Sequence, residues 1–158
     1  MPQQEQRRNG NEVVNANNVP MAPLRRVLAG ARTLTADDNG AICLFNTAAG
    51  YTITLPAASP GLYFDFAVTT TITSVGAKVI CASGDFLLGT IWQIIDTSYA
   101  PTARAANGTD IVSWNGNGTT TGGYAGDTFR VMAISDTQWH ISGFNVATGS
   151  EATPFATS

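Results

Sequence analysis

Apolar and polar residues alternate most clearly in residues 51–68. Residues 51–55 and residues 62–68 each carry apolar side chains at every second position. A period of two is typical of a β-strand with one buried face. Between the two runs, Pro56 and Pro60 have no N–H to donate to a sheet, so the chain must leave the sheet there. We therefore predict two strands joined by a β-arch or hairpin, with one apolar face.

Weaker runs of the same alternation recur along the chain, separated by residues that favour turns, such as Asn39-Gly40. They predict further strands at residues 41–45, 77–81, 86–88, 91–95, 110–114, 129–133 and 138–142. No segment has a sustained helical period. About eight to ten short strands in one chain indicate a sandwich, a jelly roll or a barrel. We predict an all-β fold, a jelly-roll-like sandwich or barrel with an extended N-terminal arm.

The first 23 residues differ in composition from the rest of the chain. They are rich in Gln, Asn and Arg, and Pro20 and Pro23 oppose regular structure. We expect three parts: an extended N-terminal arm at 1–31, a β-sandwich body at 32–146 and a C-terminal tail at 147–158.

Charged residues are few and unevenly distributed. They make up 12% of the chain, about half the usual share, and such a surface suits a protein that works in an assembly. Residues 1–32 hold five arginines and two glutamates, a net charge of +3. The remainder holds three cations and nine carboxylates, a net charge of −6. A basic arm is therefore attached to an acidic body.

The two cysteines and the N-terminus bear on the compartment. Cys43 and Cys81 have no metal-binding spacing, and we interpret both as small buried hydrophobic residues in a reducing compartment, with a single disulfide as the alternative. No apolar run reaches 18 residues, so we expect no membrane span. The polar N-terminus lacks the apolar core of a signal peptide, so we expect synthesis in a cytoplasm.

No group of residues has the spacing of a catalytic, metal or phosphate site. Asp37 and Asp38 precede Asn-Gly, and we expect them in a turn. His140 is the only histidine, and no second ligand or nucleophile is marked near it in the sequence. Arginines without interleaved aromatic residues, on an acidic body, disfavour nucleic acid as a partner. We expect a protein that is not an enzyme and that has no cofactor.

Several segments together resemble a known module. They are Thr-Leu-Thr-Ala-Asp-Asp-Asn-Gly at 33–40, Thr-Ile-Thr-Leu-Pro at 52–56 followed by Gly61, Gly-Asp at 84–85, Gly-Asp-Thr-Phe at 126–129 and Trp-His-Ile-Ser-Gly at 139–143. Over about residues 32–144, the chain resembles a recurrent β-module of tailed-phage virion proteins. The family that it resembles most is the head decoration, or capsid cement, proteins of tailed bacteriophages, and related modules also occur in tail fibres.

The resemblance implies a homotrimer on the outer surface of a phage capsid, made in the host cytoplasm and bound to several major capsid protein subunits. It carries over no catalytic residue. A closed ring also suits a β body of low charge, because it buries apolar surface without open-ended association. The cluster at 91–95 suggests a subunit interface, with Trp92, Ile94 and Tyr99 as its candidate residues.

The arm is the candidate capsid-binding element, because three arms per trimer would act together. Its arginines would pair with acidic protein surfaces, and its apolar residues would anchor it. The candidate residues are Arg7, Arg8, Val13, Val14, Val19, Leu24, Arg25 and Arg26. The alternative is a tail-fibre or receptor-binding module that would hold a host glycan with the tryptophans and a flexible Gly/Thr-rich loop at 115–123.

Overall fold

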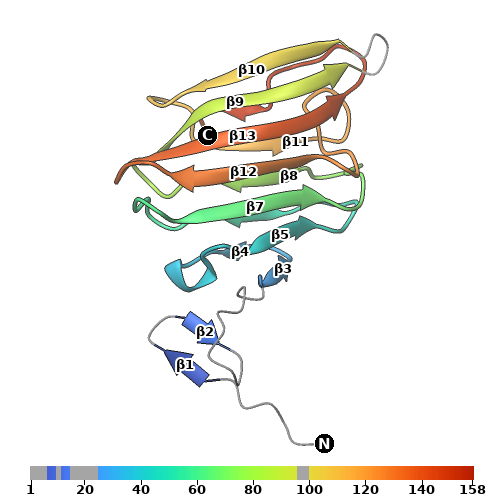
Figure 1. The fold of residues 1–158 in the computed structure, drawn as a ribbon. Coiled ribbons are helices and arrows are strands. Elements are labelled where there is room, and N and C mark those ends of the chain that lie inside the picture. The colour runs from blue at the N-terminus through green and yellow to red at the C-terminus, as the bar shows by residue number, and fades with distance from the viewer. Residues whose placement is uncertain (1–6, 10–11, 15–24, 96–99) are drawn as a thin grey trace, which may run out of the picture.

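The computed structural model describes residues 7–9, 12–14, 25–95 and 100–158. Two mixed β-sheets pack against each other, and the prediction of an all-β sandwich is confirmed (Figure 1). The strands are β1 (Arg7–Asn9), β2 (Glu12–Val14), β3 (Val27–Ala29), β4 (Arg32–Thr33), β5 (Ile42–Phe45), β6 (Thr52–Thr54), β7 (Tyr63–Val68), β8 (Ala77–Ile80), β9 (Phe86–Ile95), β10 (Pro101–Asn107), β11 (Ser113–Gly116), β12 (Thr128–Ala133), β13 (Gln138–Ala147) and β14 (Phe155–Ala156). A single 3-10 turn, Ala36–Asp38, is the only helical element of the described residues.

The two sheets differ in size. The seven-stranded sheet has the order β10-β9-β13-β12-β7-β5-β3, and the five-stranded sheet has the order β14-β11-β8-β6-β4. β1 and β2 form a separate antiparallel pair, although we expected no regular structure in the arm. In Figure 1 the seven-stranded sheet faces the viewer, and the five-stranded sheet lies behind it.

From β3 to β8 the chain passes from one sheet to the other with each successive strand. Strands of one sheet are therefore separated by a strand of the other, and they run parallel: β3 with β5, β5 with β7, β4 with β6, and β6 with β8. A jelly roll is built from antiparallel strands, so this half of the chain does not follow the connectivity we favoured. The connection between β6 and β7 is an arch, because these strands lie in different sheets.

Both sheets extend beyond residues 32–146, the bounds expected for the body. β3 is the edge strand of the seven-stranded sheet, where Val27 is in register with Ile42. β14 pairs with β11 at the edge of the five-stranded sheet, where Phe155 is in register with Trp114. The two edge strands thus come from the regions that we expected to form the arm and the tail.

The core lies between the sheets, where the alternating apolar residues point. In β7, Phe64, Phe66 and Val68 are buried, while Tyr63 and Asp65 lie on the other face and are partly exposed. The Phe129 ring stacks on Phe66 with 5.0 Å between ring centroids, and its centroid lies 4.4 Å from that of Trp114. Because Trp114 belongs to the five-stranded sheet, these rings join the two layers.

Candidate functional site

The outer face of the seven-stranded sheet carries large apolar side chains in contact with solvent. Val27 is 61% exposed, Phe144 59%, Trp92 45% and Met132 41%. Single exposed apolar residues are common on protein surfaces, but these four share one face of one sheet. Trp92 and Phe144 are partners in the parallel register of β9 and β13, so their side chains are neighbours. We call this surface the outer face.

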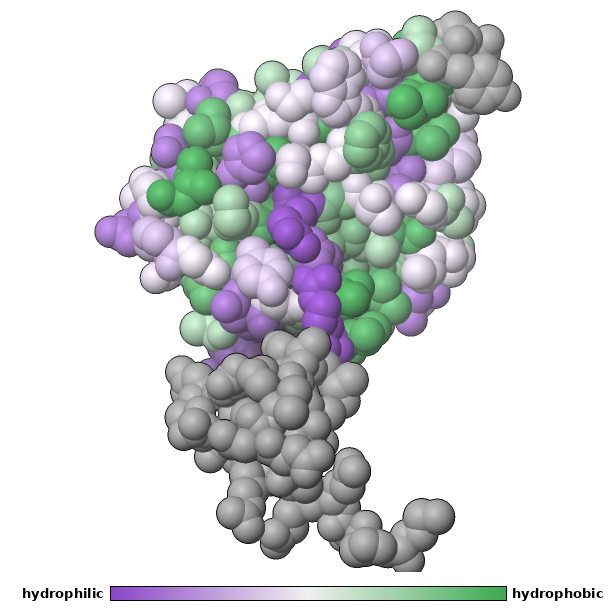
Figure 2. Space-filling model, viewed as in Figure 1, coloured by the Kyte–Doolittle hydropathy of each residue, from purple (hydrophilic) through white to green (hydrophobic). Residues whose placement is uncertain are grey.

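Polar residues cross the middle of the outer face. The strand registers align the polar residues Asp65, Arg130 and Ser142 across β7, β12 and β13, with the apolar Ile42 next to Asp65 on β5. Val27 continues this row on β3. The space-filling view shows hydrophilic residues running across this face between hydrophobic areas (Figure 2). The outer face therefore combines apolar area with a polar centre.

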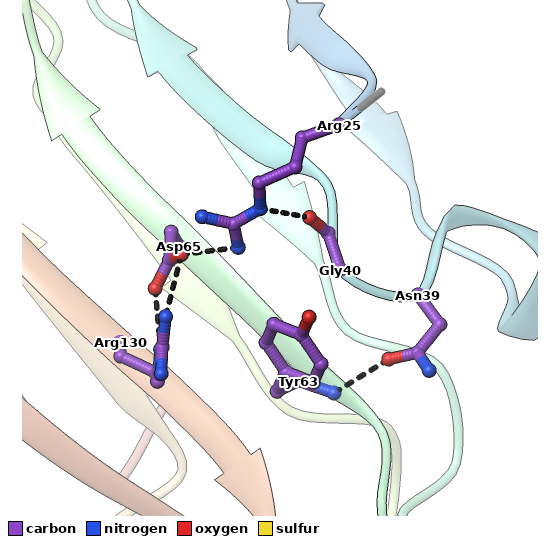
Figure 3. Close-up of polar contacts among 6 residues, drawn as sticks. All are labelled: Arg25, Asn39, Gly40, Tyr63, Asp65 and Arg130. Carbon is purple, nitrogen blue, oxygen red and sulfur yellow. Dashed lines mark hydrogen bonds and ion pairs between the residues drawn. The ribbon is translucent and has the colours of Figure 1, made fainter. Parts of the chain in front are cut away.

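The polar centre is a cluster of two arginines and one aspartate, and we call it the Asp65 cluster (Figure 3). Arg130 donates from Nε to Asp65 Oδ1 at 2.6 Å and from Nη2 to Asp65 Oδ2 at 2.9 Å. Arg25 donates from Nη2 to the same Oδ2 and from Nε to the Gly40 carbonyl oxygen at 2.9 Å. One carboxylate thus binds two guanidinium groups that come from distant parts of the chain.

Tyr63 supports both arginines from the next outward position of β7. The centre of its ring lies 5.1 Å from Arg130 Cζ and 5.7 Å from Arg25 Cζ, within the range of cation–π contacts. The backbone N–H of Tyr63 donates to Asn39 Oδ1 at 2.8 Å, and Gly40 N donates to the Tyr63 carbonyl oxygen at 2.9 Å. The predicted Asn-Gly turn is thereby attached to β7 beside the cluster.

Gly40 has a structural reason to be glycine. Its φ is +77°, and a Cβ atom there would lie 3.1 Å from Tyr63 Oη. A larger residue at this position would therefore press on the ring that the two arginines contact. The sequence of the turn in this way fixes the position of the Gly40 carbonyl oxygen that accepts from Arg25.

The charges of the Asp65 cluster do not balance. Hydrogen bonds from Arg130, followed by those from Arg25, lower the pKa of Asp65 below its ordinary value, although partial burial opposes this. The Asp65 carboxylate in turn raises the pKa of Arg130. Because a guanidinium group is always protonated in proteins, two cations share one anion in this cluster. The cluster has a net charge of +1 on a body that is otherwise acidic.

A shallow depression of about 430 Å³ lies beside the cluster. Its lining includes the charged residues Arg25, Asp65 and Arg130 and the apolar residues Ile42, Ala67 and Phe144. The side chain of Arg25 is 38% exposed and that of Arg130 is 51% exposed. A ligand in the depression would meet cationic donors on one side and apolar carbon on the other.

The predicted subunit-interface residues lie on the outer face as far as the structure describes them. Trp92 is exposed, and Ile94 is partly buried two residues further along β9, with its side chain on the same face. Tyr99 lies outside the described residues.

The predicted arm residues fall into three groups. Arg25 belongs to the Asp65 cluster, and Arg26 forms an ion pair with Asp38 at 2.8 Å between Nη1 and Oδ1. The second group lies in the backbone pair of β1 and β2: Arg7, Arg8, Val13 and Val14. Val19 and Leu24 lie outside the described residues.

Three residues of the outer face were missed by the sequence reasoning: Asp65, Arg130 and Phe144. The sequence does contain a signal for Phe144. Trp139 and Ile141 point inward, so alternation along β13 places Phe144 on the outward side, where an apolar residue is unusual. Nothing local marks the pairing of Asp65 with Arg130. The two residues are 65 positions apart and meet only when β7 and β12 pair.

The glycan platform of three tryptophans is not present. Trp114 and Trp139 are fully buried, and Trp92 alone reaches the surface. The loop expected to be flexible is held by its own hydrogen bonds, because Asn117 Oδ1 accepts from the backbone N–H groups of Thr119 and Thr121 at 2.9 and 3.1 Å.

The remaining candidates for chemistry have structural roles. Asp37 and Asp38 lie in the 3-10 turn as predicted, where Asp38 Oδ2 accepts from the Thr35 backbone N–H at 3.0 Å. Among the described residues, no group of three or more His, Cys, Asp or Glu side chains is arranged to hold a metal ion. The same part of the chain contains no helix long and apolar enough to cross a membrane.

Comparisons with known protein families, with curated proteins and with solved structures find no match to this chain. The residues of the outer face and the sequence resemblance are therefore the grounds for a functional proposal.

Proposed function

We propose that this protein is a structural virion protein that decorates and stabilises a phage capsid. It binds across neighbouring major capsid protein subunits, as a homotrimer on the outer surface of the capsid. The observation that carries the proposal is the outer face, where Trp92, Phe144 and Met132 are exposed on the same side of one sheet. Such a surface supports a role in assembly, because exposed aromatic neighbours such as Trp92 and Phe144, with polar residues around them, are typical of protein interaction sites.

The size of the outer face suits a protein interface. Seven strands about 4.8 Å apart, each about six residues long, cover roughly 600 Å². A stable protein–protein interface buries about 800 Å² on each partner. Each end of the outer face therefore needs further area, from flanking loops or from the arm, to complete a specific contact.

The two ends of the outer face differ in chemistry, and we assign them different partners. The end at β9 carries Trp92 and Ile94, and it forms the contact between subunits of the trimer. The end at β3 and β5 carries Arg25, which belongs to the C-terminal part of the arm, and it contacts the major capsid protein. The arm adds binding strength through Arg7, Arg8, Val13, Val14, Val19, Leu24 and Arg26. Three arms per trimer bind together, which multiplies a weak contact.

Cosedimentation tests this proposal. The full-length protein and a form without residues 1–23 are mixed with tailed-phage capsids stripped of accessory proteins, and light scattering gives the mass of each form. The proposal expects a trimer in both cases, saturable binding of the full-length form, and binding that is lost or strongly reduced without the arm.

Two results would contradict the proposal. Undiminished occupancy of the shortened form would remove the arm from the mechanism. Failure of both forms to bind any capsid would favour the tail-fibre alternative, and glycan arrays with the full-length protein would then test it.

A further inference from the structure

We infer that the depression beside the Asp65 cluster is a binding site for a carboxylate, and that its occupant is an acidic side chain of an extended segment of a partner protein. The inference deepens the proposed function, and it rests on that function only for the assignment of the segment to the capsid. The binding chemistry itself rests on the outer face.

The first argument is the supply of donors. A guanidinium group has five N–H donors. Arg130 gives two hydrogen bonds to Asp65, and Arg25 gives one to Asp65 and one to Gly40. The Nη1 group of each arginine has no partner among the described residues, and both side chains are partly exposed. Two N–H donors on each Nη1 therefore remain for an incoming acceptor.

The second argument is charge. The cluster carries two cations and one anion, whereas residues 33–158 as a whole carry three cations and nine carboxylates. The depression is thus a local positive site on a negative body. An anionic group is attracted to it, and a cationic or large acidic surface is not.

The third argument is preorganisation. Asp65 holds Arg130 by two hydrogen bonds, Gly40 holds Nε of Arg25, and the Tyr63 ring contacts both guanidinium groups. Long side chains normally lose rotational freedom when they bind a ligand. Here both arginines are already ordered in the free protein, so a carboxylate meets donors in place. Guanidinium groups bind a carboxylate better than a hydroxyl or an amide, because a carboxylate offers two acceptor oxygens and a negative charge.

The apolar side of the depression specifies the rest of the occupant. Ile42, Ala67 and Phe144 lie beside the charged residues. In an extended peptide, side chains two positions apart lie on the same side at a separation of about 7 Å. An acidic residue with an aromatic or aliphatic residue two positions away therefore fits both halves of the depression. A free inorganic anion would use only the charged half.

The experiment titrates the protein with a peptide whose termini are blocked and that contains Glu-Thr-Phe in a neutral sequence. The control is the same peptide with Gln in place of Glu. The full-length protein is used, and NMR follows the Trp92 indole N–H and the Arg130 Nε–H. A single carboxylate contact gives a Kd on the order of 1 mM. We expect binding of the Glu peptide, weaker binding at high salt, and no saturable shift with the Gln peptide.

Matched variants separate a ligand site from a purely internal ion pair. Arg130→Gln should weaken binding about tenfold or more, because a charge-assisted hydrogen bond is lost. Lys78→Gln, on the five-stranded sheet, removes a cation outside the depression and should change nothing. Circular dichroism confirms that each variant is folded.

Equal binding of the Glu and Gln peptides, or undiminished binding of the Glu peptide by folded Arg130→Gln, would overturn the carboxylate site. Capsid cosedimentation, carried out beside the peptide titration, distinguishes failure of the site from failure of the proposed function. If the Glu peptide binds as expected but the protein binds no capsid, the site stands and the proposed function fails. If the protein binds capsids equally well with Arg130→Gln and in excess Glu peptide, the proposed function stands and the assignment of the bound segment to the capsid is refuted.

Discussion

Arg130 and Asp65 form a two-point pair across β12 and β7, with Nε to Oδ1 at 2.6 Å and Nη2 to Oδ2 at 2.9 Å. The pair lies on the solvent side of the sheet, so its net contribution to stability is small. Its main effect is orientation, because a two-point pair fixes the plane of the guanidinium group. The pair therefore matters more for what the outer face can bind than for whether the protein folds.

Asp65→Asn should make the free energy of unfolding less dependent on pH in the acidic range. The pKa of Asp65 is lowered in the folded state, so its contribution is present above the ordinary carboxylate pKa and is lost as the pH falls below it. We expect the variant to be less stable than the wild type by about 1 kcal/mol at pH 7, with the gap closing as the pH falls below the ordinary carboxylate pKa. Urea denaturation at several pH values measures this. Asp136→Asn, an exposed turn residue, is the control and should show no such gap.

Asp127→Asn should be strongly destabilising. Asp127 is 2% exposed, and its carboxylate accepts from the backbone N–H groups of Gly123, Tyr124 and Val146 at 2.7, 3.0 and 2.9 Å. The Asn amide would direct N–H groups at one of these donors. We expect a loss of about 2 to 3 kcal/mol in the free energy of unfolding at pH 7.5, measured by chemical denaturation. One hydrogen bond typically contributes about 1 kcal/mol, so a loss below about 0.5 kcal/mol would contradict this account.

The same variant should reveal the titration of Asp127. Burial raises the pKa of Asp127 to about 6, against the lowering effect of its three N–H donors. A raised pKa in the folded state means that the contribution of the group to stability is largest at low pH and is lost as the pH rises through about 6. The difference between the wild type and Asp127→Asn should therefore widen from pH 7.5 to pH 4.5, by about 2 kcal/mol. A constant difference across this range would show that the group does not titrate there.

Gly118→Ala should destabilise the loop that joins β11 to β12. Gly118 has a φ of +74°, and a Cβ atom there would lie 1.6 Å from the Ile72 carbonyl oxygen, a backbone atom that cannot move alone. Gly84→Ala is the matched control, because Gly84 has a φ of +90° with nothing within 4 Å of the added atom. We expect the control to lose about 1 kcal/mol from the backbone conformation and Gly118→Ala to lose several times more. Thermal unfolding of both variants gives the comparison.

Phe144→Ser should weaken self-association without loss of folding. Phe144 is 59% exposed and neighbours Trp92 in the strand register, so the outer face loses apolar area while the core is untouched. Light scattering should show a lower mean mass, and the midpoint of thermal unfolding at equal dilution should change little. Val75→Ser removes an even more exposed apolar residue outside this sheet and should leave the mass unchanged.

Cys43 and Cys81 should be unreactive until the protein unfolds. Both are free and buried, and burial raises the pKa of each thiol to about 12. The thiolate is the reactive form, so its population at pH 8 is negligible in the folded state. Ellman's reagent should label no thiol in native buffer and two in 6 M guanidinium chloride. Rapid labelling of either cysteine in the native protein would place it at the surface.

Much of the fold is determined by local sequence. Alternation in 62–68 correctly assigns Phe64 and Phe66 to the core, and Asn39-Gly40 correctly predicts a tight turn. These features follow from chain geometry, because successive strand residues point to opposite faces and only certain residues adopt turn conformations readily. A reader of the sequence can therefore assign strands, turns and most of the inward positions.

Tertiary structure alone decided which strands are neighbours and what the outer face carries. The winding of β3 to β8 between two sheets makes parallel pairs that alternation cannot distinguish from antiparallel ones. It also brings Arg25 into contact with Asp65, which lies 40 residues further along the chain. The pairing of β12 with β7 brings Arg130 into contact with Asp65 across 65 residues. A strand's period identifies its buried face, but its partner is set by long-range packing of the whole chain. The sequence by itself therefore determined an all-β protein with a defined core, and only the packed sheets created the charged depression on its surface.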